Sequence, residues 1–214
     1  MNVGHCMTKN PITVAADVTV SDARAVMRAK KIHRLPVTDK AGKLVGIVTS
    51  ADLDHAAAPS ATSLDMYELH YLISKLTVES VMARKLLTVN EDLPVEEAAR
   101  IMDDNRIAGL PVLRDGKLVG IITESDLFRL FIELFGTRHP GIRLTLLLPE
   151  KPGVLASVAG AIAGIGGNIL SLATFEGEDQ TNHYCTFKVE GIPREKLLAA
   201  IKPLVMKVVN VLDT

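Results

Sequence analysis

The sequence predicts a mixed α/β fold of the α+β type, in which two copies of one unit pack as a pseudo-twofold pair before a C-terminal βαββαβ domain. The main observation is a repeat: residues 7–53 recur at 82–127, so that Leu35-Pro36-Val37 returns as Leu110-Pro111-Val112. Helical and strand-like patterns alternate within each copy. Residues 142–213 carry a third, different pattern of strands and helices.

The first copy is expected to span residues 1–58. Residues 11–14 read as a short strand, and Thr19-x-x-Asp22 is a capping-box signature that predicts a helix start. Apolar runs predict strands at 35–38 and 44–48, and a helix follows from Ala51.

Residues 59–76 are expected to link the copies, through a loop and then a helix at 65–76. One face of that helix carries the apolar residues Met66, Leu69, Leu72, Ile73 and Leu76. The second copy spans 77–135, with Pro94 where its first helix begins. It ends in an apolar helix at 127–135, whose surplus apolar surface predicts burial against another element or chain.

Residues 136–141 form a linker by their Gly and Pro content, and residues 142–214 form the third domain. Its β-α-β-β-α-β order is ferredoxin-like. The expected elements are a strand at 142–148, a helix at 153–164, strands at 168–176 and 182–189 around a turn at Glu178-Asp179, a helix from Pro193 and a strand at 204–212.

Composition excludes several classes of partner. The hydrophobic content is 48%, the aromatic content 4%, Trp is absent and the net charge is −1. This composition gives no basis for binding nucleic acid or an anionic membrane. The charge-free stretch 154–173 is long enough to span a membrane, but Gly166-Gly167-Asn168 is a strong helix stop within it. Two isolated cysteines, Cys6 and Cys185, and no signal-peptide pattern favour the reducing cytoplasm.

Two motifs identify family resemblances. The pattern G-x-φ-T-x-x-D-φ after φ-P-V, where φ is apolar, occurs at 46–53 and 120–127 and closely resembles the CBS domain, which occurs in tandem pairs (Bateman modules). The third domain resembles an ACT domain through EKPGVL at 150–155 and Gly166-Gly167-Asn168-Ile169. The whole arrangement is similar to bacterial acetoin-utilization proteins of the CBS-CBS-ACT type.

Thr49-x-x-Asp52 and Thr123-x-x-Asp126 allow two compatible interpretations. As capping boxes alone, they would only begin a helix. A helix N-terminus also attracts phosphate, and an Asp carboxylate can accept hydrogen bonds from a ribose diol. The resemblance to CBS pairs implies binding of AMP, ADP, ATP or S-adenosylmethionine. It implies a nucleotide-binding set of Thr13, His33, Arg34, Pro36, Thr49, Asp52, Thr88, Ile107, Gly109, Pro111, Thr123 and Asp126.

The two copies differ in charge near these motifs. The first copy has His33-Arg34 and Ser50, where the second has Ala108-Gly109 and Glu124. An Arg can donate charge-assisted hydrogen bonds to phosphate, whereas a Glu repels it. We therefore hypothesise that the first site prefers a phosphorylated ligand and that the second binds weakly or takes a neutral nucleoside. The alternative is that these charged side chains are simply solvated.

In the third domain, Pro152-Gly153 can be a strand-to-helix turn and nothing more. The resemblance to ACT domains implies dimerisation, with or without an amino acid bound at the dimer interface. The implied amino-acid-binding residues are Glu150, Pro152, Gly153, Val154, Leu155, Asn168 and Ile169.

Catalysis and metal binding have no support in the sequence. The six histidines lack any metal-ligand spacing, and no activated nucleophile motif is present. We expect a cytoplasmic regulatory protein, not an enzyme, that needs no cofactor apart from an adenine nucleotide as regulatory ligand. It would form a homodimer and act on a protein partner. The alternative is a ligand-free dimerisation or scaffold protein with the same fold.

Overall fold

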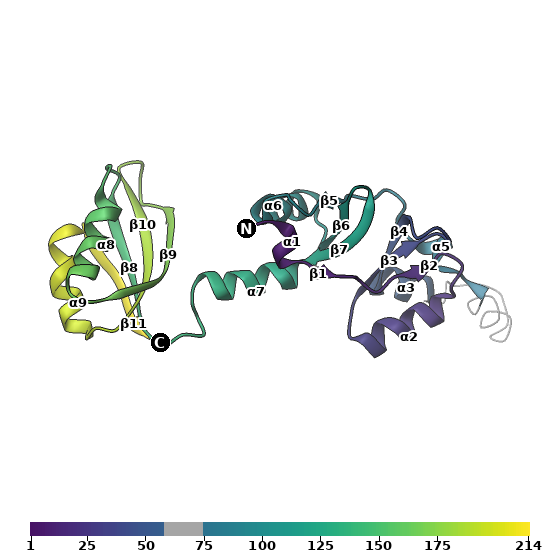
Figure 1. Cartoon of the computed structure of the whole chain (residues 1–214), viewed down its shortest axis with the longest axis horizontal. Helices are drawn as coiled ribbons and strands as arrows, with labels where there is room; N and C mark the ends of the chain where they lie inside the picture. The colour runs from purple at the N-terminus through teal and green to yellow at the C-terminus, as the bar shows by residue number, and fades with distance from the viewer. Residues whose placement is uncertain (58–74) are drawn as a thin grey trace. The chain divides into compact units, whose positions relative to one another are not determined.

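The computed structural model of the chain describes residues 1–57 and 75–214, and Figure 1 labels their helices and strands. The linking helix expected at 65–76, with Met66, Leu69, Leu72 and Ile73, lies outside the described residues apart from its last two positions. The chain forms two compact units, Met1–Leu127 and Phe128–Thr214, which are described separately below.

The first copy builds a three-stranded sheet of β2 (Val14–Ala15), β3 (Arg34–Thr38) and β4 (Leu44–Thr49). Helices α2 (Val20–Lys30) and α3 (Ser50–Ala57) contact each other and contribute to one apolar core. Val20, Ala23 and Met27 are buried because their spacing places them on one face of α2. The strand predicted at 11–14 was placed too early: it begins at Val14, and Pro11 has no N–H to donate to a ladder.

The second copy repeats these elements as β5 (Val89–Asn90), α6 (Val95–Asn105), β6 (Gly109–Arg114), β7 (Lys117–Thr123) and α7 (Glu124–Leu134). Pro94 is the N-cap of α6, as the sequence predicts. Both first helices end on a residue in the left-handed region, Lys31 at φ 54° and Arg106 at φ 52°. The matched helix ends mean that the copies can be compared position by position.

The short segment that precedes each copy in the sequence packs on the other copy. Helix α1 (Val3–Cys6) and strand β1 (Thr8–Lys9) pack on the second copy, where β1 pairs with β7 in the sheet order β1-β7-β6-β5. Helix α5 (Val78–Val81) packs on the first copy, and Ala83 forms a bridge with Ile47 of β4. Each copy is therefore completed by the segment that precedes the other copy in the sequence.

A methionine fixes each exchanged segment against a glycine. Met82 lies on Gly46 of β4, and Met7 lies on Gly120 of β7. Both methionines are 8% exposed. Glycine is needed at both strand positions because a Cβ there would overlap the methionine side chain.

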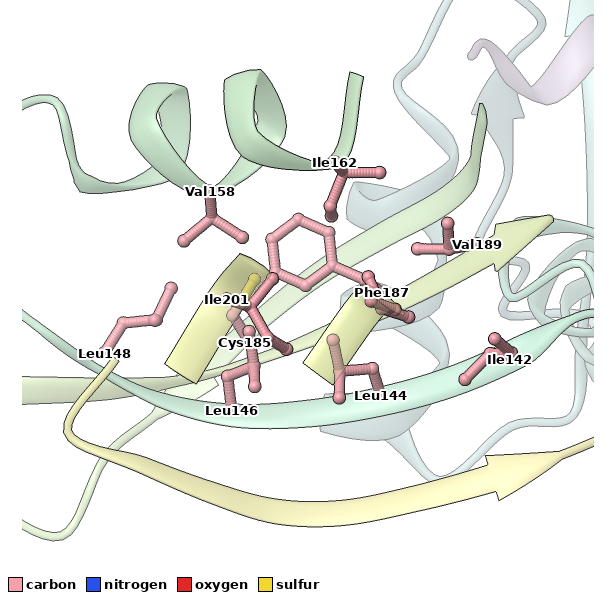
Figure 2. Close-up of a cluster of buried hydrophobic side chains, with 11 residues drawn as sticks. Ile142, Leu144, Leu146, Leu148, Val158, Ile162, Cys185, Phe187, Val189 and Ile201 are labelled. Atoms are coloured by element: carbon pink, nitrogen blue, oxygen red, sulfur yellow. The ribbon is translucent and has the colours of Figure 1, made fainter. Parts of the chain in front are cut away.

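The second unit has the predicted βαββαβ order. Its strands are β8 (Ile142–Pro149), β9 (Asn168–Glu176), β10 (Asn182–Glu190) and β11 (Lys207–Asp213), in the antiparallel order β11-β8-β10-β9. Figure 2 shows Val158 and Ile162 of α8 (Val154–Gly164) facing Phe187 and its neighbours on the sheet. Leu197 and Ile201 of α9 (Arg194–Ile201) complete this core.

In this unit the last strand starts later than predicted, and the charge-free stretch is divided between a helix and a strand. The last strand was predicted from residue 204 but begins at Lys207, because residues 202–204 form a 3-10 turn that contains Pro203. The charge-free stretch 154–173 is split between α8 and β9, with Gly166 at φ 87° after the helix. Among the described helices, none is long and apolar enough to cross a membrane.

The apolar helix predicted at 127–135 is α7, and its apolar side chains are only partly covered. Phe128, Phe131 and Leu134 are 68%, 56% and 57% exposed. Phe135, just beyond the helix, stacks on Phe175 of β9 with ring centroids 6.2 Å apart. The predicted burial against another element is therefore confined to the end of this helix.

Candidate functional site

The two Thr-x-x-Asp motifs form matching capping boxes. In the first copy, the Thr49 amide and hydroxyl both donate to Oδ2 of Asp52, at 2.8 and 2.7 Å. In the second, the Thr123 amide and hydroxyl donate to Oδ2 of Asp126 at the same two distances. These bonds use one carboxylate oxygen of each Asp, and they hold both carboxylates at the start of a helix.

The sheets place the remaining predicted residues around each motif. Arg34 pairs with Thr49 across β3 and β4, and Gly109 pairs with Thr123 across β6 and β7. Pro36 and Pro111 are buried in the middle of these strands. Thr13 and Thr88 are exposed and come directly before the parallel strands β2 and β5, and Ile107 is half-buried before β6. The structure thus gathers the predicted set by copy, around two helix starts.

The side chain of Arg34 extends from the first copy to the second. Its guanidinium donates to the backbone carbonyl of Ala108 in the second copy. Burial lowers the pKa of Arg34, while the nearby carboxylates of Glu124 and Asp126 act in the opposite direction. The sequence assigned Arg34 to the first site and treated Glu124 as an uncompensated charge. The structure instead places the Arg34 cation beside Glu124, so the two charges partly offset each other.

A pocket of about 430 Å³ opens beside the first motif, between the end of α2 and the start of α3. Four basic side chains and one acidic side chain line it, together with apolar and polar neighbours: Arg24, Met27, Arg28, Lys31, Ile32, His33, Ser50 and Asp54. Of these residues, the sequence singled out only His33 and Ser50. The cations of α2 could have been found by comparing the two copies, because their counterparts in α6 differ in charge.

The predicted amino-acid site begins at the loop between β8 and α8. Glu150, Pro152 and Gly153 are exposed there, and Gly153 has φ 87°, which suits glycine. Oε2 of Glu150 lies 2.8 Å from Nδ1 of His183, within ion-pair distance if the imidazole is protonated, although the two groups are not oriented as a hydrogen bond. The acidic side chain therefore already has a neighbour in β10.

Val154 and Leu155 follow that loop directly as the first residues of α8, but Asn168 and Ile169 do not join it. Asn168 donates to Glu190 at 2.8 Å, at one end of β10, whereas Pro149 pairs with Asn182 at the other end. Eight residue steps of a strand separate these ends by roughly 26 Å. Val154, Leu155 and Ile169 pack against the core of the unit. Within one chain, the predicted amino-acid set is thus split between two ends of the sheet.

No group of three or more His, Cys, Asp or Glu side chains suited to a metal ion occurs among residues 1–57 and 75–214.

Comparison with known families agrees with this architecture. The family model of the CBS domain matches residues 3–58 and 78–133, which together make up more than half of the chain. The chain belongs to the CBS-domain family. Residues 144–213 match the AHAS small subunit-like ACT domain. The protein is therefore a tandem CBS pair followed by an ACT-like domain, as its motifs suggested.

Two curated relatives illustrate how this pair occurs elsewhere. A CBS domain-containing protein of Dictyostelium discoideum is 37% identical over 139 residues, which cover 62% of this chain and 92% of that protein. L-aspartate semialdehyde sulfurtransferase of Methanocaldococcus jannaschii is 36% identical over 130 residues, 60% of this chain. The match spans only 23% of that enzyme, so it concerns the CBS pair and not the remainder of the enzyme.

Three solved structures resemble the CBS pair. The CBS pair of protein MJ0100, in complex with 5′-methylthioadenosine and S-adenosyl-L-methionine, is 33% identical with a TM-score of 0.52, covering 65% of this chain and 98% of that one. CBSX2 in complex with AMP is 34% identical with a TM-score of 0.51, covering 61% and 96%. An acetoin utilization protein (AcuB) from Vibrio cholerae is 31% identical with a TM-score of 0.54, covering 64% and 95%.

Proposed function

We propose that this protein is a cytoplasmic regulatory sensor whose CBS pair binds an adenine nucleotide or S-adenosylmethionine. The observation that carries the proposal is the matched pair of Thr-x-x-Asp capping boxes, each with its carboxylate held by the Thr amide and hydroxyl. Relatives with the same fold are complexed with AMP or with S-adenosylmethionine. A role linked to acetoin utilization is part of the proposal, supported by the likeness to AcuB.

The chemistry of the motif suits an adenosine ligand. The capping box of the first copy uses Oδ2 of Asp52, so the other oxygen of that carboxylate can accept a hydrogen bond from a ribose hydroxyl. The partial positive charge at the N-terminal end of α3 favours an anionic group. A ligand bound there would reinforce the helix start, so occupancy would change the local order of α3.

The two sites are proposed to differ in ligand. The first retains the cations of its pocket and is assigned a phosphorylated ligand. The second has Glu124 at its helix start, with Arg34 beside it. Because Arg34 only partly offsets two carboxylates, we assign the second site a neutral or cationic adenosine compound.

The ACT-like domain is proposed to dimerise the chain and to sense an amino acid. The Glu150 loop and Asn168 lie at opposite ends of β10, so one site containing both would need contributions from two chains. Ligand binding in either domain would change the affinity for a regulated protein partner. Such allostery requires that the nucleotide site of the CBS pair and the amino-acid site of the ACT-like domain affect each other reciprocally.

The decisive experiment is isothermal titration of the ligand-free full chain with AMP, ADP, ATP, NAD and S-adenosylmethionine. We expect saturable binding of at least one compound, lost in Asp52→Ala or Asp126→Ala. Asp22→Ala is the matched control, since the Asp22 carboxylate also accepts from a Thr hydroxyl three residues earlier, that of Thr19, at the start of α2. Binding that survives both site variants would refute the assigned residues. Absence of binding by every compound would favour the alternative, a ligand-free scaffold.

A further inference from the structure

Two cations are opposed across the sheet of the second unit. Lys188 of β10 is the Cα partner of Arg143 of β8. Both side chains lie on the sheet face away from α8 and α9, because the residues on either side of each belong to the core beneath those helices. Like charges directly opposite each other in an antiparallel pair destabilise a sheet. This pair of strands would therefore be stabilised by a compensating negative charge.

One of the two cations is buried. Lys188 is only 3% exposed, and a lysine is almost never buried to this extent unless it is paired. Within residues 1–57 and 75–214, however, its side chain forms no hydrogen bond and no ion pair. Burial of an unpaired ammonium group is strongly unfavourable. The lysine thus lacks the partner that its position requires.

The neighbours of these cations on the sheet do not supply the missing charge. Nη1 of Arg143 donates to the neutral Oγ1 of Thr145 at 3.3 Å. Glu190 lies two residues beyond Lys188 on β10, but it accepts a hydrogen bond from Asn168 at 2.8 Å. In the part of the chain that the structure describes, neither cation forms an ion pair with a carboxylate. The positive charge on this face is therefore unbalanced.

The linker 136–141 covers the aliphatic stem of the lysine. A Cβ added to Gly136 would lie 3.6 Å from Cδ of Lys188, and one added to Gly141 would lie 3.5 Å from its Cε. Between these glycines the linker carries Arg138 and His139, both exposed, and no acidic residue. The linker therefore shields the stem from water and adds basic side chains without adding a carboxylate.

We propose that Lys188 and Arg143 bind a small oxyanion, a phosphate or a carboxylate group, on this face of the ACT-like domain. Such a group would accept charge-assisted hydrogen bonds from both cations and offset their repulsion. Ser171, the Cα partner of Lys188 on β9, is 9% exposed and places a hydroxyl donor on the other side of the lysine. The site belongs to the second unit, whereas the Thr-x-x-Asp motifs belong to the first, so it is independent of the proposed nucleotide binding.

The test is calorimetric titration of the full, ligand-free chain with inorganic phosphate, sulfate and acetate, at an ionic strength held constant with sodium chloride. Lys188→Met keeps the length of the stem without its charge, and Arg143→Gln removes the opposing charge. Each substitution removes a charge-assisted hydrogen bond and should weaken binding at least about tenfold.

Lys207→Met is the matched control. Lys207 is an exposed lysine of the same sheet, and its Cα partner is Leu147. Leu147 lies four residue steps from Arg143 along β8, roughly 13 Å away. The control should therefore change the dissociation constant of the oxyanion less than twofold.

Thermal unfolding of the ligand-free variants gives a second readout. Lys188→Met should unfold at the same temperature as the parent or at a higher one, because it replaces an unpaired buried charge by an apolar side chain. A lower unfolding temperature would show that the lysine already has a partner in the protein, and it would overturn the proposal.

The titrations also separate this site from the CBS pair. Oxyanion binding that Lys188→Met and Arg143→Gln weaken, and that Asp52→Ala and Asp126→Ala leave intact, supports the proposal, and the tighter of phosphate and acetate identifies the group. Binding that is lost only in the two Asp variants assigns the anion to the CBS pair and overturns the site. Absence of saturable binding by all three anions overturns it as well, and leaves the proposed nucleotide sensor unaffected.

Discussion

The side chain of Met7 lies directly over Gly120, a residue of the other repeat, at the point where β1 pairs with β7. A Cβ at residue 120 would lie 2.9 Å from Cγ of Met7 and closer still to its sulfur. Gly120→Ala should therefore force Met7 out of its position and destabilise the protein by about 1–3 kcal/mol. Urea denaturation measures this change.

Gly160→Ala is a suitable control for that substitution. Gly160 lies in α8 with open space around its Cα, so alanine there should stabilise by about 0.5–1 kcal/mol. Gly46→Ala should behave like Gly120→Ala, because Met82 occupies the equivalent position. Equal stability of Gly120→Ala and the parent would contradict the contact.

Removal of residues 1–9 should loosen the second repeat and leave the first intact. The amides of Val3 and Gly4 donate to carbonyls of residues 93 and 91, and β1 is an edge strand of the second sheet. Hydrogen exchange should accelerate in β7 and little in β4. Faster exchange in β4 instead would show that the segment belongs with the adjacent repeat.

Thr123→Val should destabilise the protein by about 1 kcal/mol, because it removes the hydroxyl that donates to the buried Asp126 carboxylate. Thr49→Val removes the equivalent bond to Asp52 and should have a similar effect. Thermal unfolding measures both, with the exposed Thr174→Val as control. An effect no larger than that of the control would exclude a contribution of the box to stability.

Arg34→Gln should destabilise the protein by about 1.5–3 kcal/mol, since it removes a charge-assisted hydrogen bond to the carbonyl of Ala108. Glu124→Gln should lessen that effect, because Arg34 also interacts with Glu124. A double-mutant cycle of the two substitutions measures their coupling. Strict additivity would mean that the two charges act independently.

The thiol of Cys185 should be inert, because burial raises its pKa to about 12. An unfolded thiol ionises near pH 8.5. The folded chain keeps this proton while the unfolded chain releases it, so stability should fall as pH rises from about 8.5 towards 12. Cys185→Ala should flatten this dependence in urea titrations. In native protein at pH 8, a thiol reagent should modify Cys6, which is partly exposed, before Cys185.

The sequence predicted local structure well where the residue pattern itself decides the outcome. The capping boxes at Thr49 and Thr123 formed as expected, and strand β9 has the predicted bounds 168–176. These features depend on side chains within a few residues of one another. The errors were local too: the strands expected to start at residues 11 and 204 start at residues 14 and 207.

Contacts between distant segments could not be predicted in the same way. Repeat spacing does not say which copy receives Met7, because both copies offer an equivalent glycine. Arg34 crosses to Ala108 for a similar reason: its direction depends on how the copies pack. The split between Glu150 and Asn168 follows from strand register, which the motifs do not encode.

Because of the exchanged segments, the two structural copies do not coincide with the two copies of the sequence repeat. The second structural copy is discontinuous in the chain, since residues 2–9 complete a sheet whose other strands lie between residues 89 and 123. Its formation requires closure of a loop that contains the whole first copy, which raises the contact order and slows folding. During synthesis, β1 cannot pair until β7 has left the ribosome. This CBS pair should therefore fold cooperatively, and only after both copies have been synthesised.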